Sequence, residues 1–299
     1  MRILVLGGTG FLGRHAAERL RALPGAQVLH AGRSPRADLP LDLAHGDTVR
    51  LASALRKAAP HAVVNCAGAV GGSAVDLTGV NALGPAALCA ALAEAAPKAR
   101  LVHLGSAAEY GPADRPLTET AAARPAGLYG AAKLAGTLAV TGSGLDAAVL
   151  RVFNPVGPGA PAASLPGRLA GLLREAGRDG RVRVGDLSAH RDFVDARDVA
   201  DAVALAVTAP GPLPPVLNIA GGTARPVRAV AEALIAAAGF RGRLDEDGAG
   251  SSRSAAVPWQ EADVSLARKA LNWSPRRSLA TSLADLWAEV ADRPEECAR

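Results

Sequence analysis

The amino-acid sequence predicts an α/β protein that is built on a doubly wound parallel sheet and carries a smaller C-terminal lobe. Three observations support this prediction. A buried strand, a glycine-rich turn and a helix follow one another at the start of the chain. Apolar runs of strand length then alternate with helical patterns as far as residue 152, as in repeated βαβ units. After residue 155 proline and glycine become frequent and the helices become shorter, which indicates a second, smaller unit.

The glycine-rich turn at residues 7–13 follows an apolar run with the continuous hydrophobicity of a strand that is buried on both faces. Its glycines fit two spacings, Gly8-x-Gly10-x-x-Gly13 and Gly7-x-x-Gly10-x-x-Gly13. Glycine lets the backbone take a positive φ and approach a phosphate closely, and the N-terminus of the next helix attracts an anion. Because the motif stands between a strand and a helix, it predicts a Rossmann-type dinucleotide site. A tight turn without a ligand is the alternative.

Strands and helices continue to alternate beyond this turn. The further predicted strands are residues 27–31, 62–66, 101–104 and 147–152, followed by two isolated strands at 181–184 and 216–219. The predicted helices are residues 48–59 with Asp47 as the N-cap, 73–96 with an interruption near Gly84 and Pro85, 128–140 and 195–208.

These elements divide the chain into two units. We assign residues 1–154, together with about 191–209, to an NAD(P)-binding Rossmann domain. We assign about 155–190 and 210–299 to a smaller substrate-binding lobe.

The composition is that of an ordinary globular protein, with 49% hydrophobic and 20% charged residues in 299. The net charge of +5 comes from scattered arginines and not from a basic run, so nucleic acid is not an expected partner. None of the three cysteines has a C-x-x-C partner, so no metal site is predicted. The first apolar run is too short for a signal peptide, and no run has membrane-spanning length. We therefore expect a cytoplasmic protein that does not bind membranes.

The residues that predict catalysis are Tyr129 and Lys133, in the segment LYGAAK. Residues four apart share a helix face, so both side chains should point into the same cleft. A free tyrosine titrates near pH ~10, and a neighbouring ammonium group lowers its pKa because it favours the phenolate. The pair therefore predicts a tyrosine general acid/base that works near neutral pH. A surface lysine beside a packed tyrosine is the alternative.

With these two motifs and their spacing, the chain resembles the extended short-chain dehydrogenase/reductase family, the NAD(P)-dependent epimerases, dehydratases and reductases of nucleotide sugars. The resemblance covers almost the whole chain. Its matching segments are GGTGFLG at 7–13, Asp42-Leu43, NCAG at 65–68, Asn81, GSAAEYG at 105–111, YGAAK at 129–133, RVFNPVGP at 151–158 and RDFVDARDVADA at 191–202.

The resemblance implies a catalytic role for three residues. Ser106 would donate a hydrogen bond to the substrate oxygen that is, or becomes, a carbonyl. Tyr129 would be the general acid/base, and Lys133 would bind the nicotinamide ribose and tune the tyrosine. For Ser106 the alternative is a cap of the turn that follows its strand.

The resemblance also implies a cofactor site and a substrate site. The implied cofactor-binding residues are Gly7, Gly10, Phe11, Leu12, Gly13, Asp42, Leu43, Cys66, Ala67, Gly68, Asn81, Tyr129 and Lys133, and the implied substrate-binding residues are Ser106, Asn154 and Arg191. Asp42 would meet the adenine ring, while Asn154 and Arg191 would hold the pyrophosphate of a nucleotide sugar. The alternative for Asn81 is a buried brace, and for Asp42 and Arg191 a solvated side chain.

Two departures from the family pattern narrow the expected chemistry. NAD-preferring members usually carry an acid where the second strand of this chain ends in AGRS at 31–34. Arg33 would instead accommodate a 2′-phosphate, so NADP is the expected cofactor and NAD the alternative. The 4,6-dehydratases carry an Asp-Glu pair where this chain has Ala107 and Ala108, which argues against dehydration. The segment GSAAEYG looks closest to GDP-4-keto-6-deoxymannose reductase and its relatives.

The leading hypothesis is an NADPH-dependent reductase of a keto group on a nucleotide-linked sugar, or the reverse alcohol dehydrogenation. A nucleotide-sugar 4-epimerase would use the same three catalytic residues, and a non-catalytic Rossmann regulator that senses a dinucleotide is the second alternative. The alanine-rich helices at 85–96 and 128–140 predict a homodimer, because family members often dimerise through the equivalent pair. The alternative is that both helices pack only onto the sheet.

Overall fold

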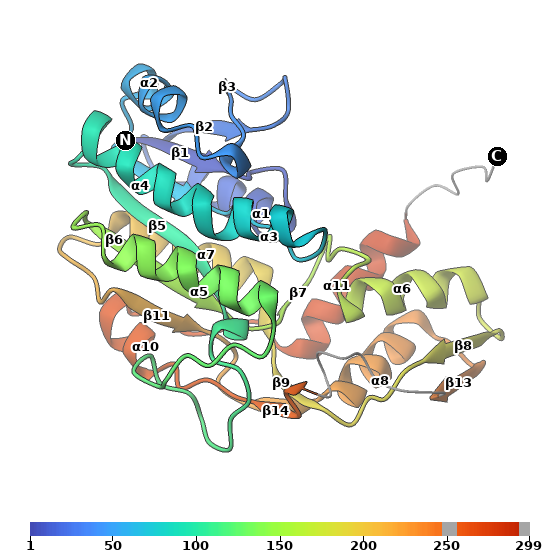
Figure 1. Ribbon diagram of the computed structural model, residues 1–299. Helices are drawn as coiled ribbons and strands as arrows, with labels where there is room; N and C mark the ends of the chain where they lie inside the picture. The colour runs from blue at the N-terminus through green and yellow to red at the C-terminus, as the bar shows by residue number, and fades with distance from the viewer. Residues whose placement is uncertain (247–255, 293–299) are drawn as a thin grey trace.

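The computed structural model describes residues 1–246 and 256–292, which form a large α/β domain and a smaller lobe, on the right in Figure 1. The strands of its main sheet are, in spatial order, β11 (Val216–Ile219), β6 (Ala147–Val152), β5 (Arg100–Ser106), β4 (Ala62–Asn65), β1 (Arg2–Leu6), β2 (Gln27–Gly32) and β3 (Leu39–Pro40). All pairings in this sheet are parallel, and the strand order reverses between β1 and β4. This is the doubly wound Rossmann arrangement, so the predicted fold class is confirmed.

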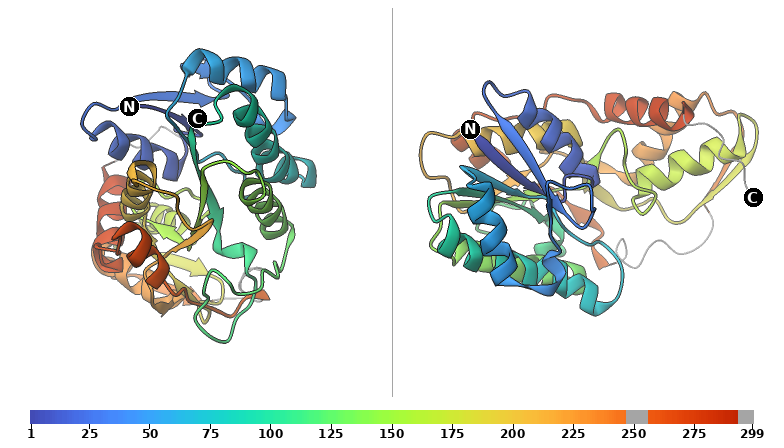
Figure 2. Two further views of the ribbon diagram at one scale, coloured as in Figure 1. Left: turned by 90° about the vertical axis from the view of Figure 1, so that its left-hand side faces the viewer. Right: turned by 90° about the horizontal axis from the view of Figure 1, so that it is seen from above.

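Helices cover both faces of the sheet (Figure 2, left). One face carries α2 (Thr48–Ala58), α4 (Gly84–Ala95) and α5 (Leu128–Thr141), and the other carries α1 (Phe11–Arg21), α7 (Ala196–Thr208) and α10 (Ser265–Leu271). Successive residues of a strand point to opposite faces, so Leu4 of β1 packs in the core under α2 and α4 while Val5 packs in the core under α1 and α7. Burial on both faces explains why the strands are continuously apolar.

Of the two predicted helices that follow β3 and β4, the first begins where it was predicted and the second differs from the prediction. α2 begins after Asp47, whose carboxylate accepts the Arg50 N–H at 3.0 Å, as predicted for an N-cap. The expected interruption near Gly84 and Pro85 is wrong. α3 (Ala74–Thr78) continues through a π-helical turn, Gly79–Leu83, directly into α4. Pro85 lies in the first turn of α4, where a missing N–H is tolerated.

The continuous helical stretch Ala74–Ala95 is long and apolar enough to span a membrane by length and composition alone. Half of its most apolar window is buried against the rest of the domain. The core helix of an α/β protein has the same properties, so this stretch is weak evidence for a membrane span.

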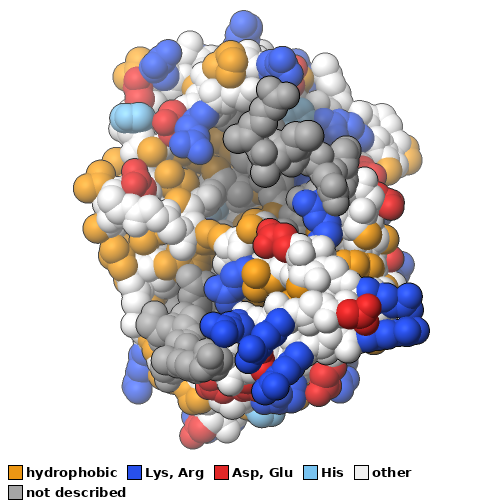
Figure 3. Space-filling view, turned by 90° about the vertical axis from the view of Figure 1, so that its right-hand side faces the viewer, with side chains coloured by type: hydrophobic (Ala, Val, Ile, Leu, Met, Phe, Trp, Pro, Cys, Tyr) orange, Lys and Arg blue, Asp and Glu red, His pale blue; other side chains and the backbone are white. Residues whose placement is uncertain are grey.

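The smaller lobe packs α6 (Leu165–Ala176), α8 (Val227–Ala238) and α11 (Leu279–Ala291) around a core of their own. Beside them, β8 (Arg181–Val184) pairs in parallel with β13 (Arg243–Glu246). Figure 3 looks onto this lobe and shows basic side chains gathered with acidic ones among them. The ion pairs of the lobe include Arg181 with Asp245 and Arg228 with Glu246.

The predicted division of the chain needs one correction. Residues 210–299 were all expected in the lobe, with 216–219 as an isolated strand. β11 instead pairs with β6 and extends the main sheet, and α10 packs on the same domain. The side chains of Leu217 and Ile219 are fully buried in the core under α1 and α7, and pairing with β6 gives the strand its backbone partners.

Short strands join the domain to the lobe. β7 (Pro155–Val156) pairs with β10 (Val194–Asp195), and β9 (His190–Asp192) lies between β12 (Ala224–Pro226) and β14 (Trp259–Gln260). The fully buried Asp192 holds this junction together, because its carboxylate accepts the N–H groups of Gly221, Gly222 and Ala262 at 2.7–3.1 Å.

Candidate active site

The predicted dinucleotide turn is a close-packed cradle of backbone. Gly7 has a φ of +72°, and a Cβ there would lie 2.7 Å from the backbone nitrogen of Ala67. A Cβ on Gly13 would lie 2.1 Å from the carbonyl oxygen of Gly7. Only glycine fits both positions, so the ends of β1 and β4 meet at the point where the strand order reverses. Gly10 is the N-cap of α1 and supplies no side-chain cap, which leaves the first N–H groups of the helix for an anion. This cradle fits a dinucleotide pyrophosphate.

The other predicted cofactor residues line this region from several elements. Phe11 starts α1, and its ring meets the His15 ring edge-on, with 5.8 Å between the ring centroids. Leu12 is half-buried against the core. Cys66, Ala67 and Gly68 follow β4, with Ala67 beside the glycine turn.

A second group of predicted cofactor residues lies at β2 and β3. Asp42 caps the short 3₁₀ helix Leu43–His45, because its Oδ1 accepts the Ala44 N–H at 2.9 Å. Leu43 is buried in the core. Arg33 is exposed and lines a hollow of about 330 Å³ together with Asp42 and Arg50. The structure therefore places Arg33 and Asp42 at one hollow.

Ser106 and Tyr129 lie on two elements that glycine allows to approach closely. Ser106 ends β5, and its Oγ accepts the Ala108 N–H at 3.2 Å. The expected cap is present, but it uses the hydroxyl oxygen as an acceptor and so leaves the O–H as a donor. A Cβ on Gly130 would lie 2.3 Å from the carbonyl oxygen of Ala108, so only glycine lets the first turn of α5 rest on the turn after Ser106. This packing puts the half-buried Tyr129 beside that turn.

Lys133 and Asn81 occupy the buried side of the same region. The Lys133 Nζ donates to the carbonyl oxygen of Leu104 and lies 3.9 Å from the position that a Cβ on Gly68 would take. Asn81 is fully buried, accepts the Ala69 N–H at 3.2 Å and donates to the Ala69 carbonyl at 2.8 Å. The Asn81 side chain therefore braces the backbone next to Gly68.

Burial and nearby charge act in opposite directions on the lysine. Burial lowers the pKa of Lys133 to about 8, while the negative charge of Glu109 opposes that shift. Near neutral pH the side chain is therefore an ammonium group, one helical turn from Tyr129.

The two predicted pyrophosphate ligands lie at the junction of domain and lobe. The Nδ2 of Asn154 donates to the Asp192 carbonyl at 2.8 Å, and Asn154 has a positive φ of 23°. Arg191 is largely buried and donates from Nη1 to the His190 carbonyl at 2.8 Å. The structure brings the two residues together around β9, but one amide donor of Asn154 is engaged within the protein.

Sequence reasoning did not single out Glu109 as a functional residue. It is fully buried in the turn after Ser106 and forms an ion pair with Arg151 of β6, with a distance of 2.7 Å between Oε2 and Nε. The only signal in the sequence is an acidic residue between a buried strand and an aromatic residue.

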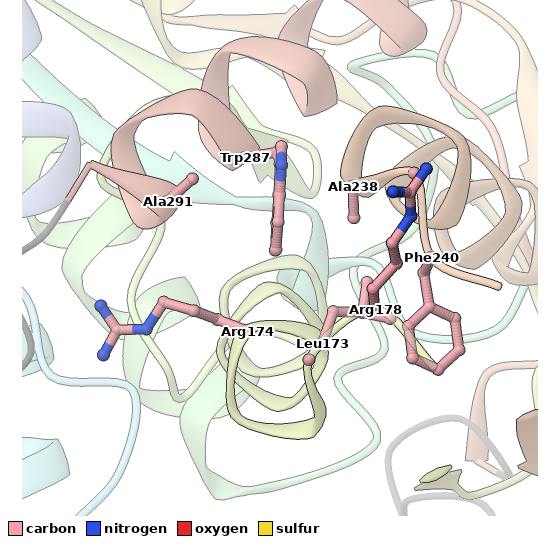
Figure 4. A pocket seen from close by; sticks show the side chains of 9 residues that line it. Leu173, Arg174, Arg178, Ala238, Phe240, Trp287 and Ala291 are labelled. Atoms are coloured by element: carbon pink, nitrogen blue, oxygen red, sulfur yellow. The ribbon is translucent and has the colours of Figure 1, made fainter. Parts of the chain in front are cut away.

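Two other observations concern places where a ligand could bind. A hollow of about 380 Å³ lies in the lobe among α6, α8 and α11, where Arg174, Arg178 and Trp287 line it (Figure 4). No predicted site residue borders it. Among residues 1–246 and 256–292, no group of three or more His, Cys, Asp or Glu side chains is placed to hold a metal ion.

Comparison with known proteins decides the family. The model of the NAD dependent epimerase/dehydratase family matches residues 3–220. The chain belongs to this family. It is therefore an enzyme of the extended short-chain dehydrogenase/reductase class, and the resemblance noted in the sequence is confirmed.

Individual proteins match over nearly the full length of the chain. It is 38% identical to dTDP-6-deoxy-L-talose 4-dehydrogenase (NAD(P)(+)) from Kitasatospora kifunensis, over 98% of this chain and 96% of that protein. The structure of MoeE5 in complex with UDP-glucuronic acid and NAD is similar with a TM-score of 0.83 and 27% identity, over 97% and 98% of the two chains. RMD from Pseudomonas aeruginosa, complexed with NADPH, shares the fold with a TM-score of 0.84, at 22% identity and the same coverage.

Proposed function

We propose that this enzyme interconverts a 4-keto group and a hydroxyl group on a nucleotide-linked sugar, with NADP(H) as the cofactor. The family and the glycine cradle support a nicotinamide dinucleotide. The named activity of the Kitasatospora relative supports a dTDP-linked deoxysugar and chemistry at its 4-position. The observation that carries the proposal is the packing of the Ser106 turn against the start of α5, one turn before the buried Lys133.

The bound nicotinamide would supply the hydride in the direction of reduction. Ser106 would donate its O–H to the keto oxygen, and Tyr129 would give its proton to the oxygen as negative charge develops there. The Lys133 ammonium would stabilise the phenolate that remains. The two residues directly after Ser106 are Ala107 and Ala108, which carry no carboxylate, and this favours simple reduction or oxidation over elimination of water.

The direct test is to incubate the purified enzyme with dTDP-6-deoxy-L-talose and NADP⁺. We expect reduced nicotinamide, seen by its absorbance, and one equivalent of a 4-keto sugar nucleotide, seen by mass spectrometry. A 4-epimerase would instead give an isomeric sugar without net reduction of the cofactor. Binding of cofactor without turnover of dTDP-, UDP- or GDP-linked sugars would contradict both enzymatic functions and favour a regulator.

The preference for NADPH should depend on Arg33. The nearest acid after Arg33 in the sequence is Asp38. Its carboxylate accepts the backbone N–H of His30 at 2.8 Å, so it is engaged within β2 and not beyond the end of that strand. Arg33 is exposed at the hollow that Asp42 also lines, where its guanidinium suits a 2′-phosphate. We expect NADPH to bind more tightly than NADH by about 1–3 kcal/mol, and Arg33→Ala to remove most of this difference.

Isothermal titration with both cofactors measures this preference. Arg115→Ala, at an exposed arginine outside the hollow, is the matched control and should keep the preference. Equal affinity of the native enzyme for NADPH and NADH would refute the assignment of Arg33.

The homodimer remains a prediction that the outer faces of α4 and α5 support. These two helices lie side by side in Figure 1. Exposed apolar residues form a stripe on each helix, Ala86 and Ala90 on α4 with Leu83 just before it, and Leu128, Ala131, Ala135 and Leu138 on α5, while the exposed Glu94 near the end of α4 pairs with Arg56 of α2. Leu138 is 61% exposed, and its contact with a second copy would remove that apolar surface from water.

Sedimentation velocity at micromolar concentration should show a dimer for the native chain and a monomer for Leu138→Glu. Val49→Glu is the control, because Val49 is 77% exposed but lies on α2. A native chain that sediments as a monomer would exclude the dimer.

A further inference from the structure

Glu109 connects three elements of the candidate active site. Its Oε1 accepts the backbone N–H of Ser106 at 2.7 Å. Its Oε2 accepts the Thr137 hydroxyl at 2.9 Å and the Arg151 Nε–H at 2.7 Å. Thr137 lies one helical turn after Lys133 on α5, so one fully buried carboxylate ties the end of β5 to α5 and to β6.

Several ionisable groups face Lys133, and Glu109 is the one that supplies negative charge to it. Burial raises the pKa of the Cys66 thiol to about 12, so the thiol is neutral. Burial, and the Lys133 charge after it, lower the pKa of His103 on β5 well below its usual range, so the imidazole is neutral too. Tyr129 lies one turn earlier on α5. Arg151 on β6 is positive and is paired with Glu109.

We propose that Glu109 is a positioning residue of this active site, which holds the backbone of Ser106 and supplies the negative charge that faces the Lys133 ammonium. The inference rests on the proposed function, because it assigns Ser106 and Lys133 their roles there. Glu109 itself does not touch the substrate in this account. It acts through Ser106, which would contact the substrate, and through Lys133, which would tune the proton donor Tyr129.

A purely structural ion pair would not need this location. Replacing a buried pair by apolar side chains of similar volume is often neutral for stability. This pair, however, places its carboxylate on the residue that ends β5 and beside the only lysine of α5. Removing the negative charge leaves Arg151 and Lys133 as buried cations in the same region. Both Lys133 and Tyr129 should then lose their protons at lower pH, because fewer negative charges oppose deprotonation.

The test is Glu109→Gln, assayed by oxidation of dTDP-6-deoxy-L-talose with NADP⁺ over a range of pH. Oxidation needs a Tyr129 phenolate and a Lys133 ammonium, so activity rises with the first ionisation and falls with the second. We expect both limbs of the profile to move to lower pH by about one unit. Glu109→Asp keeps the charge but withdraws it from the Ser106 N–H, so it should lower kcat and leave the limbs in place.

A second readout needs no substrate. The chain has four lysines, Lys57, Lys98, Lys133 and Lys269. In protein labelled with ¹³C at lysine Cε, Lys133→Arg identifies the Lys133 signal by its loss. Glu109→Gln should lower the titration midpoint of that signal by about one pH unit and leave the other three unchanged. If the native enzyme oxidises no sugar nucleotide, the proposed function fails, while this titration still decides the role of Glu109.

A matched control and a rescue variant complete the test. Asp198 of α7 is also a buried carboxylate that pairs with an arginine, Arg277, and accepts backbone N–H groups. Asp198→Asn should lower stability and leave the pH profile and the Lys133 midpoint unchanged. If Glu109→Gln does not fold, the double variant Glu109→Gln/Arg151→Met removes both buried charges and should shift the Lys133 midpoint and the profile in the same direction, but by less, because the Arg151 cation is removed as well. An unmoved Lys133 midpoint and an unmoved profile in a folded variant would overturn the inference.

Discussion

Replacing Tyr129 by phenylalanine should lower turnover by about 10²–10⁴-fold, which is the usual contribution of a positioned general acid or base. The substitution deletes one hydroxyl group from a half-buried side chain at the start of α5. It leaves the glycine cradle and Lys133 in place, so the fold and the affinity for NADPH should stay close to native. The measurement is kcat for the native enzyme and the variant with the same sugar nucleotide.

The chain offers a matched control for this result, because its other tyrosine is Tyr110. The Tyr110 hydroxyl is buried and donates to Asn218 Oδ1 of β11 at 2.7 Å. Tyr110→Phe leaves a buried acceptor without its donor, so it should lower the free energy of unfolding by about 1–3 kcal/mol with kcat within a few-fold of native. A Tyr129→Phe variant that retains more than about a tenth of native turnover would show that Tyr129 is not the general acid.

The predictable part of this fold has a common physical origin. A parallel strand that is buried on both faces must be apolar at every position, so β1, β4, β5 and β6 were visible as short hydrophobic runs. The glycine turn was visible because close backbone approach excludes a Cβ at Gly7 and Gly13. Helix spacing placed Tyr129 and Lys133 on one side of α5.

Tertiary pairing was harder to foresee. β11 has the same apolar character as the other strands, but nothing local says that it belongs to the edge of the main sheet across from β6. The π-helical turn before α4 contains the buried Asn81 and could not be deduced from Gly84 and Pro85 alone. Glu109 is a similar case, because its partners Thr137 and Arg151 lie 28 and 42 residues away. The location of a buried charge is set by contacts distant in sequence, whereas a glycine or an apolar run records its own constraint.

The substitution Gly13→Ala should remove most of the affinity for the dinucleotide and also destabilise the fold. The added Cβ would lie 2.1 Å from the Gly7 carbonyl oxygen, which accepts the Gly10 N–H at 3.0 Å, so the whole turn must shift. Overpacking of this kind costs about 1–3 kcal/mol of stability. Loss of one backbone hydrogen bond to a charged pyrophosphate costs about 1.5–3 kcal/mol, or about 10–150-fold in the dissociation constant for NADPH.

Gly171→Ala in α6 shows what the same change does where there is room. Gly171 is also a helical glycine, and no heavy atom lies within 4 Å of its Cβ position. Alanine is the better helix former by about 1 kcal/mol, so this variant should melt at a higher temperature and bind NADPH as the native chain does. Thermal unfolding and cofactor titration of the two variants therefore separate a steric effect from helix propensity. If Gly13→Ala binds NADPH with native affinity, the turn at Gly7 to Gly13 does not hold the pyrophosphate.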